Sequence, residues 1–290
     1  MIVAGRGSRD TGVMLARVAA TVALLTAAAY GVVAAVGPVG GSPGSASVAA
    51  ERDVPFATDA TCDMTTVAAL SGRHPAARQL VVMQTSSFAV TTGTVEVAVR
   101  TDDGTWRCQR GPQPARFGRA GTRPLLERRS GDDTTPAGVF PLGVVTAWDG
   151  QTFSIFGNHA DPGTLAPYRS VRHEDCWGAV TNTARYNHLV NRPGCTGPDE
   201  WLQKIGDVYA HAAVIGANLD PVSGDAPAET PFAAAIFLHR HSYSSSGAAL
   251  ATSGCVSLAM EDLVDAVRLL DPRLAPHFAI GPTDWLRSSA

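Results

Sequence analysis

Residues 234–263 of the chain read AAIFLHRHSYSSSGAALATSGCVSLAMEDL. The apolar run at its start, Ala233 to Leu238, predicts a buried strand. His239 and His241 follow, and a loop rich in Ser and Gly leads to the sequence Thr252-Ser253-Gly254-Cys255. A helix is predicted just beyond the cysteine. This order brings a thiol, an imidazole and a helix N-terminus within reach of one another, and these are the parts of a cysteine nucleophile site.

The predicted helix has one apolar face, because Leu263, Val264, Val267 and Leu270 recur at helical spacing. Ser257 is the expected N-cap, so Cys255 would lie two residues before the cap, near the positive end of the helix dipole. That position, with an imidazolium nearby, predicts a lowered thiol pKa.

Two alternatives concern the same stretch. A lone cysteine is most often a small buried apolar residue, so Cys255 could be structural. His241 is the second candidate for the base, because positions two apart on a strand share a face and it would lie beside His239. We favour His239, which directly follows the apolar run.

Several motifs give the chain a family resemblance. Phe237-Leu238-His239, followed after a loop by Thr252-Ser253-Gly254-Cys255-Val256, resembles the L,D-transpeptidase catalytic domain, the YkuD family. Upstream, GDDTTPAGVF at residues 131–140 is similar to a further motif of that family. Asp175-Cys176-Trp177 and Tyr186-Asn187 resemble elements of one extracytoplasmic bacterial branch. The matches follow the family order over roughly residues 78–285.

The resemblance implies an enzyme that acts on peptidoglycan stem peptides and forms 3→3 cross-links through a cysteine acyl-enzyme. Cys255 would be the nucleophile and His239 the base, oriented by a backbone carbonyl. The amides of Gly254 and Cys255 would bind the oxyanion, with Ser253 assisting and Thr252 and His241 as further possible site residues. This chemistry requires no metal and no organic cofactor.

Two other functions fit the same residues. An L,D-carboxypeptidase would use water in place of the acceptor amine. A non-catalytic cell-wall-binding protein on the same fold would carry an unreactive Cys255.

Composition excludes some classes of protein. The chain has 290 residues, of which 45% are hydrophobic and 17% charged, which is typical of a globular protein. The net charge of −3 and the lack of a basic stripe argue against nucleic-acid binding.

The N-terminal segment differs from the rest. Arginines precede or enter a long apolar stretch at 18–36, which predicts a signal peptide or a signal-anchor helix over residues 1–36. Residues 37–55 are rich in Gly, Ser, Ala and Pro and predict a flexible linker. We expect residues 56–290 to form one exported catalytic domain outside the cytoplasm, which contacts the membrane through its N-terminus if the signal is not cleaved.

The five cysteines fit an exported protein with two disulfides and one free thiol. Proximity and segment order predict the pairs Cys62–Cys108 and Cys176–Cys195, with Cys255 free. A zinc site is not expected, because the chain has neither Cys-x-x-Cys nor His-x-x-x-His spacing.

Many short strand patterns separated by Gly, Pro and Asp predict a mainly β fold, and the resemblance implies a β-sandwich with a helix after the nucleophile. Residues 157–207 are the least regular, and with Cys176 bonded to Cys195 they form a disulfide-stapled irregular insert. That insert could cover the site as a lid or groove wall, or it could be a solvated excursion whose aromatics only pack on the sheet. Tyr209, just after the insert, is a further possible site residue.

Overall fold

The computed structural model describes residues 61–219 and 232–290. The predicted signal segment and linker, residues 1–55, therefore lie outside the described residues. None of the described helices is long and apolar enough to cross a membrane.

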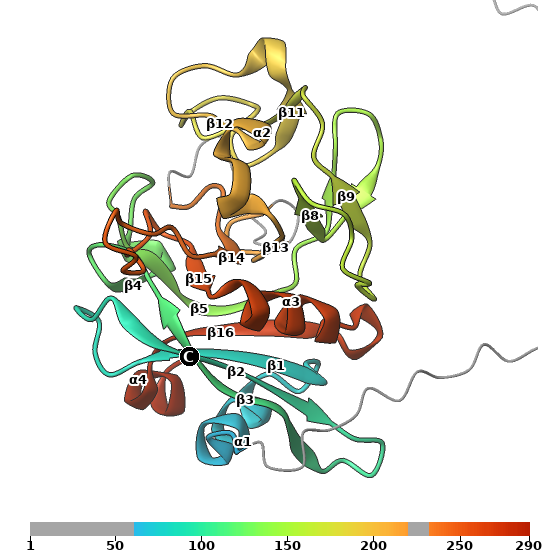
Figure 1. The fold of residues 1–290 in the computed structure, drawn as a ribbon. Helices are drawn as coiled ribbons and strands as arrows, with labels where there is room; N and C mark the ends of the chain where they lie inside the picture. Colours follow the sequence, from blue (N-terminus) through green and yellow to red (C-terminus); the bar gives the residue numbers. More distant parts are fainter. Residues whose placement is uncertain (1–60, 220–231) are drawn as a thin grey trace, which may run out of the picture. The chain divides into compact units, whose positions relative to one another are not determined.

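The described chain is mainly β, as the sequence predicts, and most of its strands join one mixed sheet of eleven strands (Figure 1). The strand order in that sheet is β4-β5-β16-β1-β2-β3-β15-β14-β13-β8-β9. The strands are β1 Gln79–Thr85, β2 Thr92–Arg100, β3 Trp106–Arg116, β4 Thr122–Pro124, β5 Thr135–Pro141, β6 Val145–Thr146, β7 Thr152–Phe153, β8 Ile155–Gly157, β9 Tyr168–Ser170, β10 Asp175–Trp177, β11 Leu189–Asn191, β12 Glu200–Trp201, β13 Ala212–Val214, β14 Phe237–Arg240, β15 Val256–Leu258 and β16 Pro276–Pro282.

Helices are few and short. The α-helices are α1 Met64–Arg73, α2 Leu202–Ile205, α3 Met260–Leu269 and α4 Thr283–Ser288. The 3-10 turns are η1 Leu125–Glu127, η2 Arg192–Gly194, η3 Gly206–Tyr209 and η4 Pro272–Leu274.

The centre of the sheet is covered on both faces, and β1 shows why. Its side chains alternate between two cores, because successive strand residues point to opposite faces. Val81 and Met83 pack in the core that contains α3, whereas Leu80 and Val82 pack in the core of α1 and α4. In Figure 1, α3 accordingly lies on one side of β1 and β16, and α1 and α4 lie on the other.

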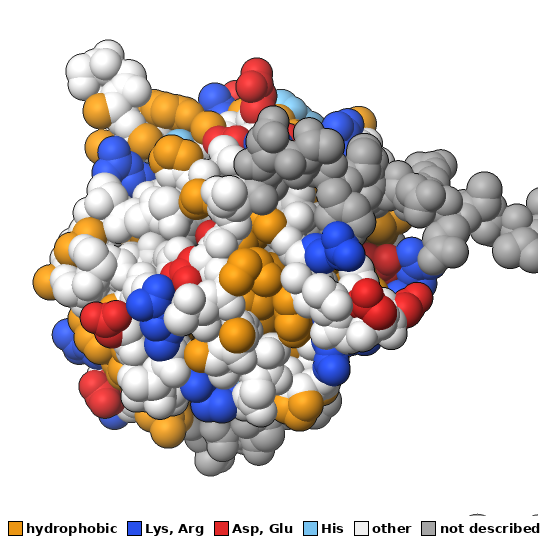
Figure 2. Space-filling view, turned by 90° about the horizontal axis from the view of Figure 1, so that it is seen from below, with side chains coloured by type: hydrophobic (Ala, Val, Ile, Leu, Met, Phe, Trp, Pro, Cys, Tyr) orange, Lys and Arg blue, Asp and Glu red, His pale blue; other side chains and the backbone are white. Residues whose placement is uncertain are grey.

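The surface around this core carries charges of both signs. Figure 2 shows one face, on which acidic and basic side chains are interspersed around a group of apolar side chains. One ion pair of the protein surface is that of Arg78 and Asp102, at 2.6 Å.

The helix after the cysteine starts later than expected. Ala259, not Ser257, is its N-cap residue, and α3 begins at Met260. Ser257 instead lies in β15, opposite His239 of β14, so a strand separates Cys255 from the helix. The prediction of Ser257 as the cap was therefore wrong: the apolar side chains of Val256 and Leu258 are fully buried in the sheet core, and this favours a strand.

The strand that carries His239 also starts later than expected. The apolar run from Ala233 predicts a strand, yet β14 begins only at Phe237. Ala235 has φ of 54°, a left-handed conformation outside the range of a regular strand. Its amide donates a hydrogen bond to Asn187 Oδ1 at 3.1 Å, so a residue of the insert holds this turn in place.

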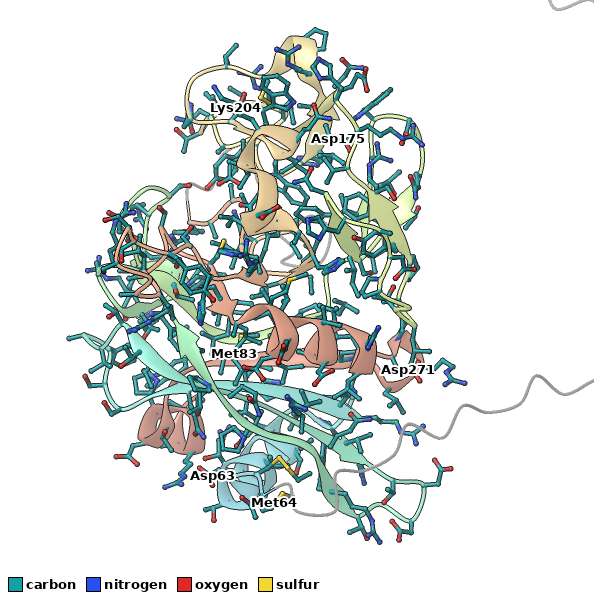
Figure 3. The ribbon with its side chains drawn as sticks, in the orientation of Figure 1. Asp63, Met64, Met83, Asp175, Lys204 and Asp271 are labelled. Atoms are coloured by element: carbon teal, nitrogen blue, oxygen red, sulfur yellow. A yellow bond between two sulfur atoms is a disulfide. The ribbon has the colours of Figure 1, made fainter. Side chains whose placement is uncertain are left out.

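The irregular insert forms a small three-stranded sheet in the order β11-β10-β12. Cys176 on β10 is bonded to Cys195, and Cys62 is bonded to Cys108, the same two pairs that the sequence predicts. A buried Arg169 joins Asp175 and Asp149 at 2.7 and 3.0 Å. Asp175 and Lys204 are labelled in Figure 3, where both lie in the insert, on the far side of α3 from α1.

The insert packs on the large sheet through its aromatics. The ring of Trp177 lies 4.8 Å from that of Phe237 on β14 and 6.4 Å from that of Phe156 on β8. The insert is thus fixed against the strand that carries His239.

Candidate active site

Parallel pairing of β14 and β15 brings the predicted cysteine and histidine together. Leu238 pairs with Val256 and His239 with Ser257, so Cys255, which precedes β15, lies beside β14. Cys255 and His239 line one cavity of about 260 Å³. Two elements distant in sequence thus supply a thiol and an imidazole to a single hollow.

The sulfur of Cys255 is held by the backbone of the preceding segment. It donates a hydrogen bond to the carbonyl oxygen of Ala235 at 3.2 Å and accepts one from the amide of Phe237 at 3.4 Å. Cys255 is 8% exposed and is the only free cysteine in the described part of the chain.

The expected lowering of the thiol pKa is not found. Burial raises the pKa of Cys255 well above its usual value, and Glu200 adds to the rise. The Phe237 amide and Arg128 act in the opposite direction. The dipole of α3 does not lower the pKa of Cys255, because α3 begins five residues after Cys255 and the dipole acts over about one turn.

The imidazole of His239 has one nitrogen fixed. Its Nδ1 lies 2.6 Å from the carbonyl oxygen of Arg240, which can only accept, so Nδ1 carries the proton. Burial lowers the pKa of His239 to about 4, so the ring is neutral and Nε2 is free to act as a base. The carbonyl of Arg240 thus fixes the orientation of the His239 ring through Nδ1. No hydrogen bond joins His239 to the Cys255 sulfur among the residues described.

His241 has a different partner. Its Nδ1 lies 2.9 Å from Ser257 Oγ, and His241 does not line the cavity that Cys255 and His239 share.

The loop before the cysteine is held by threonine hydroxyls. Thr252 Oγ1 donates to the Cys255 carbonyl at 2.6 Å and accepts from the Gly254 amide at 3.1 Å. Thr135, from the predicted motif at 131–140, donates to the same carbonyl at 3.1 Å. The Gly254 amide is therefore engaged inside the loop and does not point to a free oxyanion position. Ser253 is exposed and lines the cavity that contains His239.

A second cavity, of about 430 Å³, meets the first at the cysteine. Cys255, Ser253 and Glu200 line both. The second cavity also contains Arg128, which is 2% exposed and contacts the carbonyl oxygen of Phe232. Cys255 therefore lies between two hollows, one with an imidazole and one with a guanidinium.

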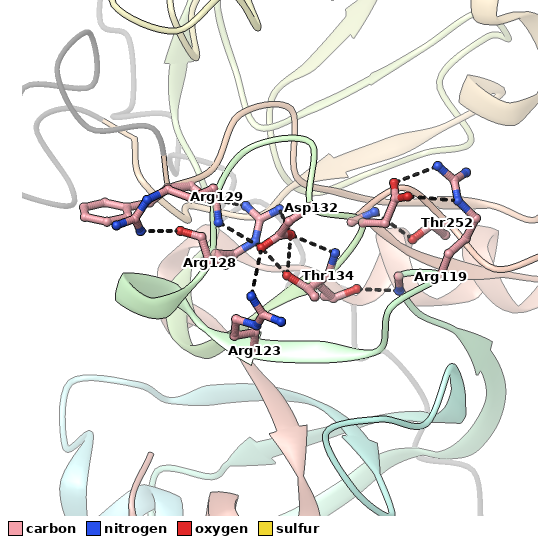
Figure 4. A network of polar contacts seen from close by, with 12 residues as sticks. Arg119, Arg123, Arg128, Arg129, Asp132, Thr134 and Thr252 are labelled. Carbon is pink, nitrogen blue, oxygen red and sulfur yellow. Dashed lines mark hydrogen bonds and ion pairs between the residues drawn. The ribbon is translucent and has the colours of Figure 1, made fainter.

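Arg128 is held by the segment that follows it. Figure 4 shows Arg123 and Arg128 pointing toward Asp132, which lies 3.7 and 3.5 Å from them. Thr134 donates to the same carboxylate at 2.6 Å, and the Arg129 amide does so at 2.9 Å. The predicted motif at 131–140 thus fixes both the cysteine loop and this arginine.

Tyr209 connects the imidazole to the insert. Its ring lies 5.5 Å from that of His239, and its hydroxyl donates to Glu200 Oε2 at 2.5 Å. Burial raises the pKa of the Glu200 carboxyl.

Sequence reasoning missed Glu200 and the turn at Ala235. Glu200 belongs to no motif and reaches the site only because β12 pairs with β10 of the disulfide-bonded insert. Asn187, which holds Ala235, was noted only as part of a resemblance.

No separate metal centre emerges from the described ranges. Their one group of clustered potential ligands is Cys176, Cys195 and Asp199, and its two sulfurs are joined in a disulfide.

Comparison with known proteins supports the sequence resemblance. No curated protein and no solved structure matches the chain significantly. A family model, YkuD, described as the L,D-transpeptidase catalytic domain, matches residues 79–276, which include every strand from β1 to β15. The match covers more than half of the chain and contains His239 and Cys255. The chain therefore belongs to the L,D-transpeptidase catalytic-domain family, whose members are cysteine-dependent acyltransferases acting on peptidoglycan peptides.

Proposed function

We propose that this protein is an L,D-transpeptidase that forms 3→3 cross-links, with Cys255 as nucleophile and His239 as base. The observation that carries the proposal is the position of Cys255 between two cavities, one of which contains His239. Transpeptidation needs a donor peptide and an acceptor peptide at one sulfur, and two cavities that meet there provide that access.

The first half of the reaction forms an acyl-enzyme. The sulfur of Cys255 attacks the carbonyl carbon of the bond between the diamino acid and D-alanine in a tetrapeptide stem. His239 Nε2 takes the thiol proton and gives it to the leaving amine. The C–N bond breaks, D-alanine leaves, and a thioester remains.

The second half transfers the acyl group. The side-chain amine of a neighbouring stem, in its neutral form, attacks the thioester carbonyl. The new C–N bond forms as the C–S bond breaks, and the amine proton passes to His239 and from there to the departing Cys255 sulfur. The cross-linked product leaves Cys255 ready for a new cycle.

The first step requires a movement of the sulfur. In this structure the thiol proton is directed at the Ala235 carbonyl. Rotation about the Cα–Cβ bond of Cys255 would break the hydrogen bond to Ala235 and turn the sulfur into the cavity that His239 lines. A side-chain rotation of this kind takes picoseconds to nanoseconds when exposed and is slower when buried.

We place this activity outside the cytoplasm. The two disulfides support that location, because such bonds persist in oxidising compartments and are rare in the cytosol.

Incubation of a disaccharide-tetrapeptide with the wild-type protein and with Cys255→Ala, followed by mass analysis, tests the proposal. We expect D-alanine release, a thioester adduct on Cys255 and cross-linked dimers, all absent from the variant. Tripeptide without dimer would indicate an L,D-carboxypeptidase. No adduct and no D-alanine release would favour a non-catalytic wall-binding protein.

A further inference from the structure

Glu200 is the single acidic residue among those that line the two cavities around Cys255. It also lines a third hollow of about 760 Å³ on the surface of the insert. One carboxyl group therefore stands where the outer groove of the insert and both inner cavities come together.

This carboxyl has an unused oxygen. Oε2 accepts the hydrogen bond from Tyr209, and no described residue donates to Oε1. No lysine, arginine or histidine in the described ranges forms an ion pair with Glu200. An unpaired buried charge is costly, so a carboxyl in this position either binds a proton, as the raised pKa of Glu200 favours, or binds a cation.

The position of the group is fixed from both sides. Glu200 lies on β12, which pairs with β10, and β10 carries the disulfide to Cys195. Tyr209, its hydrogen-bond donor, contacts the rings of Phe237 and His239. The carboxyl thus faces the reacting groups on a rigid support, which a specific binding group needs.

We propose that Glu200 binds a primary ammonium group at the entrance to the catalytic cavity. The chemistry that fits is the side-chain ammonium of a diamino acid: Oε1 accepts from it while Tyr209 holds Oε2. The identification of the ammonium with a stem-peptide side chain rests on the proposed function. The ammonium-binding site itself does not.

The consequence for the thiol follows from charge. Glu200 opposes ionisation of Cys255 in the free protein. A cation bound to Glu200 offsets that effect, so arrival of the right substrate favours the thiolate.

Reaction of Cys255 with two small thiol reagents tests the site without any enzymatic activity. The probes are 2-aminoethyl methanethiosulfonate, which carries an ammonium, and methyl methanethiosulfonate, which is neutral. In each case the thiolate attacks the reagent sulfur, an S–S bond forms and methanesulfinate leaves. Intact-protein mass gives both rates. Their ratio cancels any effect of Glu200 on thiol ionisation, because both reagents meet the same thiolate.

We expect Glu200→Gln to lower the preference for the cationic reagent about tenfold. Glu174→Gln is the matched control: it removes the same charge from the same insert, at a residue that lines the outer groove but neither cavity around Cys255. Its ratio should equal that of the wild type. Equal ratios for Glu200→Gln and the wild type, or a Cys255 that reacts with neither reagent, would overturn the proposal.

A second experiment identifies the source of the ammonium. D-Alanine release is measured from a tetrapeptide whose diamino acid side chain is free or acetylated, and the ratio of cross-linked to hydrolysed product is measured with a free-amine acceptor. If Glu200→Gln lowers release only from the free-amine donor, the ammonium belongs to the donor. If it lowers only the product ratio, the ammonium belongs to the acceptor.

The two experiments separate the two claims. Equal effects of Glu200→Gln on free and acetylated donors, with an unchanged product ratio, would overturn the assignment to substrate. A wild-type protein that releases no D-alanine would contradict the transpeptidase function, whereas the reagent ratio would still decide the ammonium site.

Discussion

The Cys255 thiol donates its proton to the carbonyl oxygen of Ala235, 3.2 Å away, and Ala235 itself is in the left-handed conformation. For a residue with a Cβ atom that conformation costs about 1–3 kcal/mol and persists only where neighbours enforce it. Asn187 enforces it: its side-chain oxygen accepts a hydrogen bond from the Ala235 backbone amide, and its side-chain nitrogen donates one to the carbonyl oxygen of Asn218 at 2.6 Å. The resting sulfur is thus held by a strained turn that the insert supports.

Ionisation of this sulfur should require unusually high pH. Because the pKa of Cys255 is raised, its thiolate fraction at any pH below that value is smaller than that of an ordinary cysteine. We expect the alkylation rate to rise about tenfold per pH unit from pH 7 and to keep rising beyond pH 9. Iodoacetamide labelling followed by intact mass measures it, with Cys255→Ala as the unlabelled control. A plateau at or below pH 8.5 would contradict the raised pKa.

The two histidines should differ in their effect on catalysis. We expect His239→Ala to lower kcat/KM for D-alanine release about 10³-fold, within the range for loss of a general base. His241→Ala should retain activity within about tenfold, because its ring is hydrogen-bonded to Ser257 and does not line the two cavities around Cys255. Retention of activity by His239→Ala together with its loss in His241→Ala would reverse the assignment.

The pH profile gives an independent check on His239. Its folded pKa of about 4 means that the base is already neutral at pH 5. On the acid side, kcat/KM should therefore stay constant down to about pH 5 and fall as the pH drops through about 4. A limb near the ordinary histidine value of about 6.5 would place the base elsewhere.

Hydrophobic pattern predicts the bounds of a strand well where those bounds depend only on the residues of the strand itself. The segment at 79–85, QLVVMQT, is an apolar run that predicts a strand from the sequence alone, and β1 has these bounds with six of its seven residues buried. The segment at 233–238 failed at its start, because Asn187 captures the Ala235 amide from 48 residues away. Such a long-range hydrogen bond cannot be predicted from the hydrophobic periodicity of the segment.

The candidate site was predicted to the same extent. Cys255 and His239 could be named because strand, loop and thiol follow one another in the chain. The N-cap of the helix after the cysteine and the charges around the Cys255 sulfur could not be predicted from the sequence. Ser257 has the side chain of a good N-cap, yet the pairing of β15 with β14 takes precedence. Burial is the main cause of the raised pKa of Cys255, and Glu200 adds to it. Glu200 lines the cavities around Cys255 through the tertiary pairing of β12 with β10, which no local sequence pattern reveals.

A buried carboxyl far from the site should give the protein a measurable pH dependence of stability. Glu96 on β2 is 1% exposed, and its Oε1 accepts the Asp63 amide at 3.0 Å. Burial raises its pKa from 4.5 to about 7, and the charge of Asp63 adds to the rise. Between these two values the folded protein binds more protons than the unfolded chain, so the unfolding free energy falls as pH rises.

The fall attributable to Glu96 is about 3 kcal/mol between pH 4.5 and 8. We expect Glu96→Gln to lack it, and so to be more stable than the wild type at pH 8 and about equal at pH 4.5. Urea unfolding at pH 4.5, 6 and 8 measures the difference, with the exposed Glu127→Gln as control. The same pH dependence in both variants would show that Glu96 is not the titrating group.

Removal of the two disulfides should rank differently in its effect on stability and in its effect on activity. Replacing Cys176 and Cys195 by Ser opens a loop with a sequence separation of 19, and replacing Cys62 and Cys108 opens one with a separation of 46. Loop-closure entropy predicts losses of about 3 and 4 kcal/mol respectively, measured by urea unfolding. On stability alone, the second pair is the more important.

Activity should show the opposite order, because the Cys176–Cys195 bridge supports the strands that carry Glu200 and the turn around Asn187. At a temperature where both double variants are folded, we expect D-alanine release to fall at least about tenfold for Cys176→Ser/Cys195→Ser, since small displacements of binding groups have effects of this size. Release by Cys62→Ser/Cys108→Ser should stay near the wild-type rate, because that bridge joins the start of α1 to β3, whose residues line neither of the two cavities. Equal losses of activity in the two variants would mean that the insert does not position the reacting groups.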